Sequence, residues 1–400
     1  MSSLSFVNCS YHHWQYSIFT TDSTLVSSMA DEETMRVWAH SRAGLPSDVL
    51  ALSTLPKPKI TSPTHVLVKI SHCALNPGGS IVMQLLPFMF RATPAIPEMD
   101  FSGTVVEAGP DVPSHRGLKS NAEVFGSIPL AQIVKSTSGA LAEYVVVDHT
   151  ALVVKPESIS MKAASGLGIA GATALQLIKA ANLRSGNLVL VNGSGGGIGH
   201  LVVQMCCEKV GPSGQVVAIC SKRSMGWIKA LDTITLQIND QADMSRTLMS
   251  RFHIIDREEQ PLVQYLTDIF GNKRFDAIID AVGIQEIYTA SPAFLAEGKP
   301  YVTVGPRAAS YTYLDMLSTL GTMARNMLWP RVLGGVARPY FQVAAASSLE
   351  TLEKLADMVR MNNLGVYVGM KVAWSDAAKV SMMLFCFRGA LTTDRPMRNC

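Results

Sequence analysis

Hydrophobic and polar residues alternate along the first third of the chain, as they do in short β-strands. In His65–Ile70 (HVLVKI) the apolar side chains fall at every second position. Similar strand-like stretches, separated by glycine and proline turns, are Thr34–Ala39, Phe101–Ala108, Glu123–Phe125 and Ala142–Val147. Short strands at this spacing predict an antiparallel, barrel-like domain that extends to about residue 150.

The pattern changes at Pro156, beyond which helical stretches alternate with continuous apolar runs. Met161–Ala181 has apolar residues near helical spacing, and Asn187–Val191 (NLVLV) is an uninterrupted apolar run, typical of a strand buried on both faces. Further buried-strand patterns are Gln215–Cys220, Phe275–Gly283 and Pro300–Gly305. Strands that alternate with helices predict βαβ units and a parallel sheet, so the fold class is α/β.

The two ends of the chain differ in character. Near the C-terminus, Ser347–Arg360 is expected to be a helix, with Ser347 and Glu350 matching a capping box, and Val366–Trp374 is strand-like. Residues 1–34 are rich in Ser, Thr and aromatic residues, and we expect a disordered extension there. No Lys or Arg precedes Arg36, so neither a signal peptide nor a presequence is predicted, and we expect a cytoplasmic protein.

Composition limits the classes of function. The length of 400 residues predicts two domains, with three as the alternative, and 48% hydrophobic residues suffice for a large core. A net charge of +3 is too weak a bias to indicate nucleic-acid binding. The seven scattered cysteines contain no C-x-x-C pair, which argues against a disulfide framework. The charge-free windows Ile70–Phe90 and Asn187–Cys207 contain glycine clusters or prolines, so no membrane helix is expected.

A glycine cluster lies where the apolar run 187–191 ends and a helical stripe begins. Glycine permits positive φ angles and close approach of backbone amides to an anion, and the helix N-terminus adds partial positive charge. This combination predicts a loop that binds the pyrophosphate of a dinucleotide. The spacing is G-x-x-G-x-x-G instead of G-x-G-x-x-G, and a flexible loop of an α/β protein is the alternative. The candidate residues are Gly193, Gly195, Gly196, Gly197, Ile198 and Gly199.

The next strand, Gln215–Cys220, ends at Ser221, Lys222 and Arg223. NAD sites place Asp or Glu at this point to bind the ribose 2′-hydroxyl, and a carboxylate there would repel a 2′-phosphate. A hydroxyl and two cations instead favour NADPH, with a solvated basic turn as the alternative. No H-E-x-x-H motif, metal-ligand cluster or G-x-S-x-G motif is present in the sequence, so no metal site is predicted.

Several motifs together resemble the medium-chain dehydrogenase/reductase family, in its zinc-free quinone oxidoreductase and enoyl reductase branch. The resemblance extends from about Met35 to Ala378, with one insertion at Asp232–His253. The motifs are specific to the family but not to a substrate. They are Ala74–Pro77, Met99–Gly109, Val124–Gly126, Gly139–Val147 and Gly171–Gln176, besides the glycine loop.

The family fold implies a GroES-like β-barrel catalytic domain and a Rossmann doubly wound sheet. The resemblance assigns residues 35–155 and 331–400 to the first, and 156–330 to the second. It places the cofactor at the carboxyl ends of the parallel strands, where Val282, Gly283 and Gly305 are expected to contact it. Dimerisation through the sixth strand is the family habit, so a homodimer is expected from the resemblance alone.

The resemblance also suggests the reacting side chains. Zinc-dependent relatives have a Cys ligand where this chain has Asn76, and a Gly-His-Glu motif where it has Met99-Asp100-Phe101. Asn76 is implied to lie near the nicotinamide as the catalytic polar contact, and Thr173 to meet the cofactor head group. An Asn-Pro turn residue is the alternative for Asn76. Gly78–Phe90 lacks the Tyr that several such reductases use as proton donor, so water or another group protonates, or the substrate is a quinone.

The predicted function is therefore an NADPH-dependent, zinc-independent reductase of an activated C=C bond or a quinone, acting on a small molecule. A catalytically weak NADPH-binding protein and a zinc alcohol dehydrogenase are the alternatives. Residues 1–34, the insertion and Phe385–Cys400 depart from the family pattern, and we hypothesise that some of them reflect gene-model errors. Arg257 stands where the family tends to have Tyr, and it could add to phosphate binding.

Overall fold

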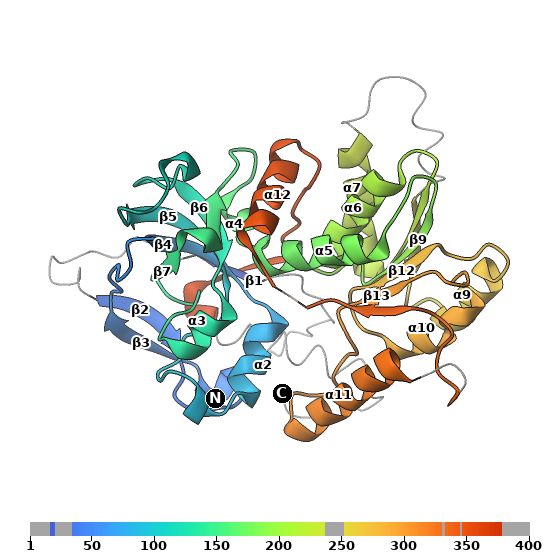
Figure 1. Cartoon of the computed structure of the whole chain (residues 1–400), viewed down its shortest axis with the longest axis horizontal. Helices are drawn as coiled ribbons and strands as arrows, with labels where there is room; N and C mark the ends of the chain where they lie inside the picture. Colours follow the sequence, from blue (N-terminus) through green and yellow to red (C-terminus); the bar gives the residue numbers. More distant parts are fainter. Residues whose placement is uncertain (1–16, 21–33, 237–251, 330–332, 345, 378–400) are drawn as a thin grey trace, which may run out of the picture.

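Alternating apolar residues make β4 (His65–Ala74) the central strand of the N-terminal sheet, because its inward face fills the barrel core. The computed structural model describes residues 17–20, 34–236, 252–329, 333–344 and 346–377 (Figure 1). The first sheet has the order β15-β1-β4-β5-β6-β8, and β7 also pairs with β4. Its other strands are β1 (Ser17–Thr20), β5 (Asp100–Ala108), β6 (Glu123–Ser127), β7 (Tyr144–Asp148), β8 (Leu152–Val154) and β15 (Met370–Ala373).

Smaller elements complete this unit. β2 (Thr34–Ala39) and β3 (Ala51–Pro56) form an antiparallel pair. The helices are α1 (Pro46–Val49), α2 (Pro77–Leu85) and α3 (Leu130–Lys135). The sequence analysis did not predict α2, which begins with Pro77, Gly78 and Gly79. Proline at the first helical position lacks only an amide that would have no partner inside the helix, so Pro77 starts α2 instead of preventing it.

One strand lies within the N-terminal 34 residues, for which we expected a disordered extension. Ser17–Thr20 form β1, which pairs with β4 on one side and with β15 on the other. The expectation does not hold for these four residues, because both neighbouring strands satisfy their backbone groups. The rest of 1–33 lies outside the described residues.

The second sheet is entirely parallel and has the order β11-β10-β9-β12-β13-β14. Val189 and Val191 face the core beneath α5 and α6, whereas Leu188 and Leu190 face α9 and α10. Helices therefore cover both faces (Figure 1), which explains the continuous apolar run of this strand. The strands are β9 (Leu188–Asn192), β10 (Gln215–Cys220), β11 (Phe252–Asp256), β12 (Ala277–Asp280), β13 (Tyr301–Thr303) and β14 (Tyr340–Gln342).

The helices of this unit are α4 (Met161–Ala164), α5 (Gly168–Ala181), α6 (Gly199–Val210), α7 (Lys222–Leu236), α9 (Leu262–Phe270), α10 (Gln285–Ala290), α11 (Tyr313–Leu328) and α12 (Leu349–Arg360). The single helix expected over Met161–Ala181 is thus two helices. The insertion expected at 232–253 includes the end of α7 and the start of β11, and its residues 237–251 lie outside the described part. Among the described helices, none is long and apolar enough to cross a membrane.

Two boundaries differ from the sequence expectation. β14 pairs with β13, so the parallel sheet continues beyond residue 330, where we placed its end. The capping box of α12 consists of Ser348 and Thr351 instead of Ser347 and Glu350. Threonine reaches back to the backbone as glutamate does, and its Oγ1 accepts the bond from the Ser348 amide at 2.8 Å. The predicted barrel-like antiparallel unit and the parallel sheet with helices on both faces are both present.

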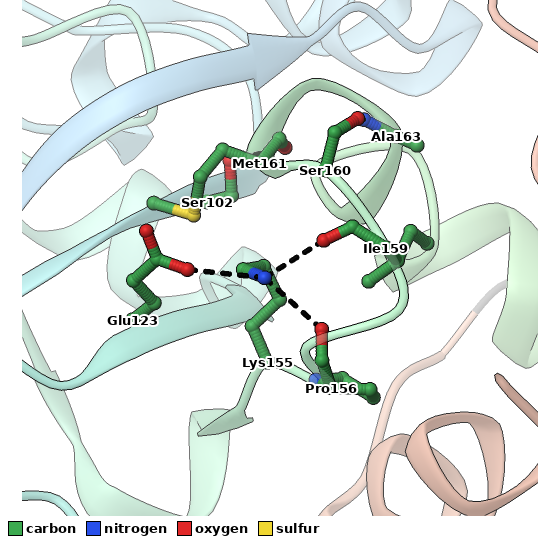
Figure 2. Close-up of polar contacts among 8 residues, drawn as sticks. All are labelled: Ser102, Glu123, Lys155, Pro156, Ile159, Ser160, Met161 and Ala163. Carbon is green, nitrogen blue, oxygen red and sulfur yellow. Dashed lines mark hydrogen bonds and ion pairs between the residues drawn. The ribbon is translucent and has the colours of Figure 1, made fainter. Parts of the chain in front are cut away.

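The chain passes from the barrel to the parallel-sheet unit beside a buried lysine (Figure 2). Lys155 follows β8, and its Nζ donates to the carbonyl oxygens of Ile159 at 2.7 Å and Pro156 at 3.0 Å. The same Nζ lies 3.0 Å from Oε2 of Glu123 on β6. The ammonium group therefore has acceptors on β6 of the barrel and in the segment that leads to α4. A buried charge needs such partners.

Candidate functional site

The glycine loop joins β9 to α6 with geometry that side chains would block. Gly193 has φ +76°, and a Cβ placed on it would lie 2.3 Å from Cγ2 of Val282. A Cβ on Gly199 would lie 2.0 Å from the Gly193 carbonyl oxygen. Real Cβ atoms do not approach so closely, so glycine is required at both positions. The loop predicted from the sequence is therefore a tight turn at the carboxyl end of β9.

The turn leaves backbone donors at the N-terminus of α6. Gly196 donates its amide to the Gly193 carbonyl at 2.8 Å, and Ser194 is fixed by two bonds to the Ile219 carbonyl. The amides of Gly195, Gly197 and Ile198 donate to none of the described residues. Amides in this arrangement, at the positive end of a helix, suit a pyrophosphate group.

His200, the second residue of α6, forms a hydrogen bond with the Gly196 carbonyl of the glycine loop. This residue was not predicted from the sequence. Its Nδ1 lies 3.0 Å from the Gly196 carbonyl oxygen, and its Nε2 accepts a bond from the Tyr367 amide at 3.2 Å. Burial lowers the pKa of His200 to about 4, although the bond to Gly196 opposes this shift. The imidazole is therefore neutral near pH 7, which matches one donating and one accepting ring nitrogen.

The carboxyl ends of β12 and β13 approach the same loop. Gly283 has φ +84°, and a Cβ on it would lie 1.8 Å from the Gly305 carbonyl oxygen. Gly305 has φ +105°, and a Cβ there would lie 2.7 Å from Nε2 of Gln342. These close approaches bring the backbone after β12 against the backbone after β13 and form a closely packed surface beside Val282 and Gly193. Such a surface is suited to a flat or phosphorylated ligand that lies against the strand ends.

Asp280 organises this corner, and sequence reasoning missed it. The carboxylate is 1% exposed and accepts a bond from Asn192 Nδ2 at 2.8 Å. It also accepts bonds from the Tyr301 hydroxyl and from the amides of residues 282, 283 and 284. One side chain thus ties the end of β9 to the loop after β12. The only sequence signal was a charged residue that ends an apolar strand.

The predicted phosphate-selecting residues lie at the start of α7. Ser221 is buried, whereas Lys222 and Arg223 are exposed. Arg257, after β11, donates its amide to the Cys220 carbonyl at 3.0 Å, which places it beside the same turn. Burial lowers the pKa of Arg223, and the charges of Glu258 and Arg257 also act on it. Lys222 and Arg223 thus closely follow β10, and Arg257 and Glu258 lie close enough to act electrostatically on Arg223.

Asn76 lies in the barrel unit at the N-terminal end of α2. Its backbone amide donates to Glu98 Oε2 at 2.9 Å, and its side-chain Nδ2 donates to Asp100 Oδ2 at 3.0 Å. The Ile169 amide, at the start of α5, donates to both oxygens of Asp100. Thr173, one turn further along α5, donates its hydroxyl to the Ile169 carbonyl at 2.6 Å. Asn76 and Thr173 are thus connected through Asp100 and Ile169.

Both carboxyl groups beside Asn76 have raised pKa values. Burial raises the pKa of Glu98 to about 8, with the Asn76 amide opposing the shift. Burial raises the pKa of Asp100 to about 6, with the Ile169 amide opposing it most. Removal of a carboxylate from water disfavours the charged form, which explains both directions. Among the residues that the structure describes, no three His, Cys, Asp or Glu side chains are grouped to hold a metal ion.

Comparison with protein families matches two parts of the chain. Residues 62–157 match the alcohol dehydrogenase GroES-like domain, and residues 252–382 match a domain described as zinc-binding dehydrogenase. The first match covers the barrel strands from β4 to β8. The second covers most of the parallel sheet beyond α7 and the return to the barrel.

Individual proteins resemble most of the chain. A trans-enoyl reductase of Penicillium oxalicum is 29% identical over 373 residues, which are 85% of this chain and 92% of that protein. An NADPH-dependent alkenal/one oxidoreductase of Arabidopsis thaliana is 28% identical, covering 68% of this chain and 70% of the relative. The structure of the quinone oxidoreductase from Coxiella burnetii superposes with a TM-score of 0.63 at 24% identity, covering 88% of this chain and 96% of the other.

Proposed function

The chain belongs to the medium-chain dehydrogenase/reductase family and is an oxidoreductase, and we propose that it reduces an activated C=C bond or a quinone with NADPH and without zinc. The observation that carries the proposal is the glycine loop, where three amides at the start of α6 donate to none of the described residues. Lys222 and Arg223 support NADPH over NADH, since they lie where the 2′-phosphate is expected. Relatives that reduce enoyl or alkenal groups support the substrate class.

Each part of the site has a task in this proposal. The glycine loop holds the pyrophosphate, and we assign Val282, Gly283 and Gly305, in the loops after β12 and β13, to contact the rest of the cofactor. When bound, NADPH supplies the hydride. Reduction of an enone or quinone places negative charge on the substrate oxygen. We assign the side-chain amide of Asn76 as the hydrogen-bond donor to this oxygen. Gly78–Phe90 contains no Tyr, so we assign the proton for a C=C substrate to water.

Two features support a reaction without zinc. Asn76 stands where zinc-dependent relatives have a Cys ligand, and its Nδ2 is bonded to Asp100. An amide is a poor zinc ligand compared with thiolate or imidazole. The matching domain nevertheless carries a zinc-binding description, so the metal content has to be measured. Stoichiometric zinc in purified protein, with activity lost on chelation, would favour the alcohol dehydrogenase alternative.

The test combines binding and turnover on the purified full-length chain. Calorimetry with NADPH and NADH measures the two affinities, and NADPH oxidation is followed with a panel of 2-enals, enones and quinones. We expect tighter binding of NADPH and turnover with at least one acceptor class. Binding without turnover favours the alternative of a catalytically weak NADPH-binding protein. No binding of either dinucleotide contradicts the proposal.

A homodimer and a cytoplasmic location are further parts of the proposal. β14 is one of the two edge strands of the parallel sheet and is the sixth strand counted from β11. Light scattering of the purified chain measures the oligomeric state. Imaging of the tagged protein in its own cells measures the location.

A further inference from the structure

Two buried carboxyl groups surround Asn76, and each has a helix N-terminus as its partner. Glu98 is 3% exposed and accepts from the Asn76 amide at the start of α2. Asp100 is 0% exposed and accepts from the Ile169 amide at the start of α5. Because burial without partners would be costly, the fold supplies a backbone amide at a helix N-terminus to each carboxyl group.

Glycines make the space for both carboxyl groups. A Cβ on Gly79 would lie 2.3 Å from Glu98 Oε1, and a Cβ on Gly168 would lie 2.2 Å from Asp100 Oδ1. Any other residue at either position would displace the carboxyl group. The arrangement therefore depends on glycine at the start of α2 and at the start of α5.

The side chain of Asn76 does not cap α2, although an asparagine at the N-cap position usually does. Asn76 is the N-cap residue of α2, where a side-chain oxygen normally accepts a bond from an amide of the first turn. No such bond is present, and Nδ2 instead donates to Asp100 at 3.0 Å. The interaction with Asp100 thus replaces the cap, which argues against the simple turn residue considered for Asn76.

We propose that Asp100 is a positioning residue, whose carboxylate holds the Asn76 amide away from the capping orientation and presents it to the substrate. An ionised carboxylate only accepts, so it fixes Nδ2 on its own side and the amide oxygen on the other. The second N–H of Nδ2 remains to meet the substrate oxygen. Without Asp100, the Asn76 side chain would turn to cap α2 and leave the site.

The same carboxylate connects the barrel to the cofactor unit. Asp100 accepts from the Ile169 amide, and the Ile169 carbonyl accepts the Thr173 hydroxyl at 2.6 Å. Thr173 is the residue we assign to the cofactor head group. Asp100 therefore sets Asn76 at a fixed place relative to α5, and the donor to the substrate is positioned against the element that faces the cofactor.

This inference rests on the proposed function of Asn76, and a double-mutant cycle tests it. The variants are Asn76→Ala, Asp100→Asn, Asp100→Ala and the two corresponding double variants, with kcat and the Kd for NADPH measured for each. We expect both Asp100 variants to lower kcat by about tenfold to a hundredfold with an NADPH Kd near wild type. In the Asn76→Ala background the same changes should alter kcat by less than about twofold.

The outcomes separate positioning from general stabilisation. If Asp100→Asn and Asp100→Ala lower kcat equally in both backgrounds, Asp100 does not act through Asn76 and the inference fails. An unchanged kcat in the Asp100 variants that retain Asn76 would also overturn it. Asp100→Asn keeps the size of the side chain and its bond to Ile169, so it reports on function where Asp100→Ala fails to fold.

A spectroscopic measurement decides the inference even without turnover. The side-chain amide resonances of Asn76, identified by their loss in Asn76→Ala, are followed against pH in uniformly ¹⁵N-labelled protein. Burial raises the pKa of Asp100 to about 6, and the other titratable groups that face it in the described chain are Glu98 and Cys73. We expect a transition near pH 6 that Asp100→Asn abolishes. A pH-independent resonance in the wild type, or the same transition in Asp100→Asn, would refute the positioning.

Discussion

Asn192 Nδ2 donates a 2.8 Å hydrogen bond to Oδ1 of Asp280, and this bond joins the ends of two adjacent parallel strands at the proposed cofactor site. Asn192 immediately precedes the glycine loop, and Asp280 immediately precedes the loop that contains Gly283. The conformations of the two loops are therefore coupled through one buried carboxylate. This coupling predicts that Asp280 contributes to both the stability and the cofactor affinity of the chain.

Replacing Asp280 with Ala should remove the acceptor of five donors. The Asn192 amide, the Tyr301 hydroxyl and the amides of residues 282–284 would lose their bond in a buried place. An unsatisfied buried donor costs about 1–3 kcal/mol. Even with water entering, we expect a loss of about 4 kcal/mol or more in the free energy of unfolding, measured by urea denaturation.

Asp268→Ala is the matched control. Asp268 is exposed on α9 and bonds only with Gln264 one turn earlier among the described residues. Its replacement should change the free energy of unfolding by about 0.5 kcal/mol or less. Similar losses for the two variants would show that Asp280 does not organise the loops.

Two glycine substitutions should separate backbone strain from steric collision. Gly283→Ala introduces a Cβ 1.8 Å from the Gly305 carbonyl oxygen, at φ +84°. Gly298→Ala has a similar φ of +72° but meets no atom within 4 Å. Left-handed backbone costs a non-glycine residue about 1–2 kcal/mol, so Gly298→Ala should lose that amount in unfolding free energy and bind NADPH normally. Gly283→Ala should lose more and bind NADPH at least about tenfold more weakly in calorimetry. Normal binding by Gly283→Ala would exclude a close approach of the cofactor there.

The glycine loop could be predicted because its chemistry is local. A buried strand, six clustered glycine-loop positions and a helical stripe follow one another without interruption, so the sequence alone indicates the strand–loop–helix unit. The end of β10 could be predicted for the same reason, since Ser221, Lys222 and Arg223 follow the strand directly. The family resemblance then supplied Asn76 and Thr173.

Asp100, Asp280 and His200 could not be predicted, because each has a partner far away in the sequence, which for His200 is the Tyr367 amide 167 residues later. Asp100 meets an amide 69 residues later, and Asp280 meets an amide side chain 88 residues earlier. In the sequence, a buried acidic residue beside an apolar run has the same pattern as an acidic residue at a surface turn. The strand β1 was missed for a similar reason, since its partners β4 and β15 alone give the segment Ser17–Thr20 a place in a sheet.

Selection of NADPH is tested by the double variant Lys222→Ala/Arg223→Ala. Loss of a charge-assisted bond to the 2′-phosphate should raise the Kd for NADPH by about tenfold to a hundredfold. The Kd for NADH should change by less than about twofold, because NADH lacks that phosphate. Lys229→Ala, an exposed cation on the same helix, is the control. Equal losses for both coenzymes would mean that the pair does not distinguish them.

Lys155 should stabilise the crossing between the two units (Figure 2). Lys155→Met keeps the length of the side chain but leaves the Ile159 and Pro156 carbonyls without their shared donor. We expect a loss of about 1–3 kcal/mol in the free energy of unfolding, the range for a buried group left unsatisfied. Glu123→Gln is the comparison, since the Glu123 side chain is 55% exposed and its ion pair should contribute at most about 1 kcal/mol. A larger loss from Glu123→Gln than from Lys155→Met would assign the stabilisation to the ion pair instead.

Replacing Glu98 with Gln should make the stability of the chain less sensitive to alkaline pH. Burial raises the pKa of Glu98 from 4.5 to about 8, so the folded state holds this proton more tightly than the unfolded state does. Stability from this group is therefore complete below pH 4.5 and falls as the pH rises towards 8. The glutamine side chain of the Glu98→Gln variant cannot ionise and still accepts the Asn76 amide. At pH 5 the two proteins should unfold at similar urea concentrations, whereas at pH 9 the variant should be more stable by roughly 2–4 kcal/mol. The titration of Asp100 occurs in both proteins and largely cancels in the comparison, so an identical difference at the two pH values would mean that Glu98 ionises normally in the folded protein.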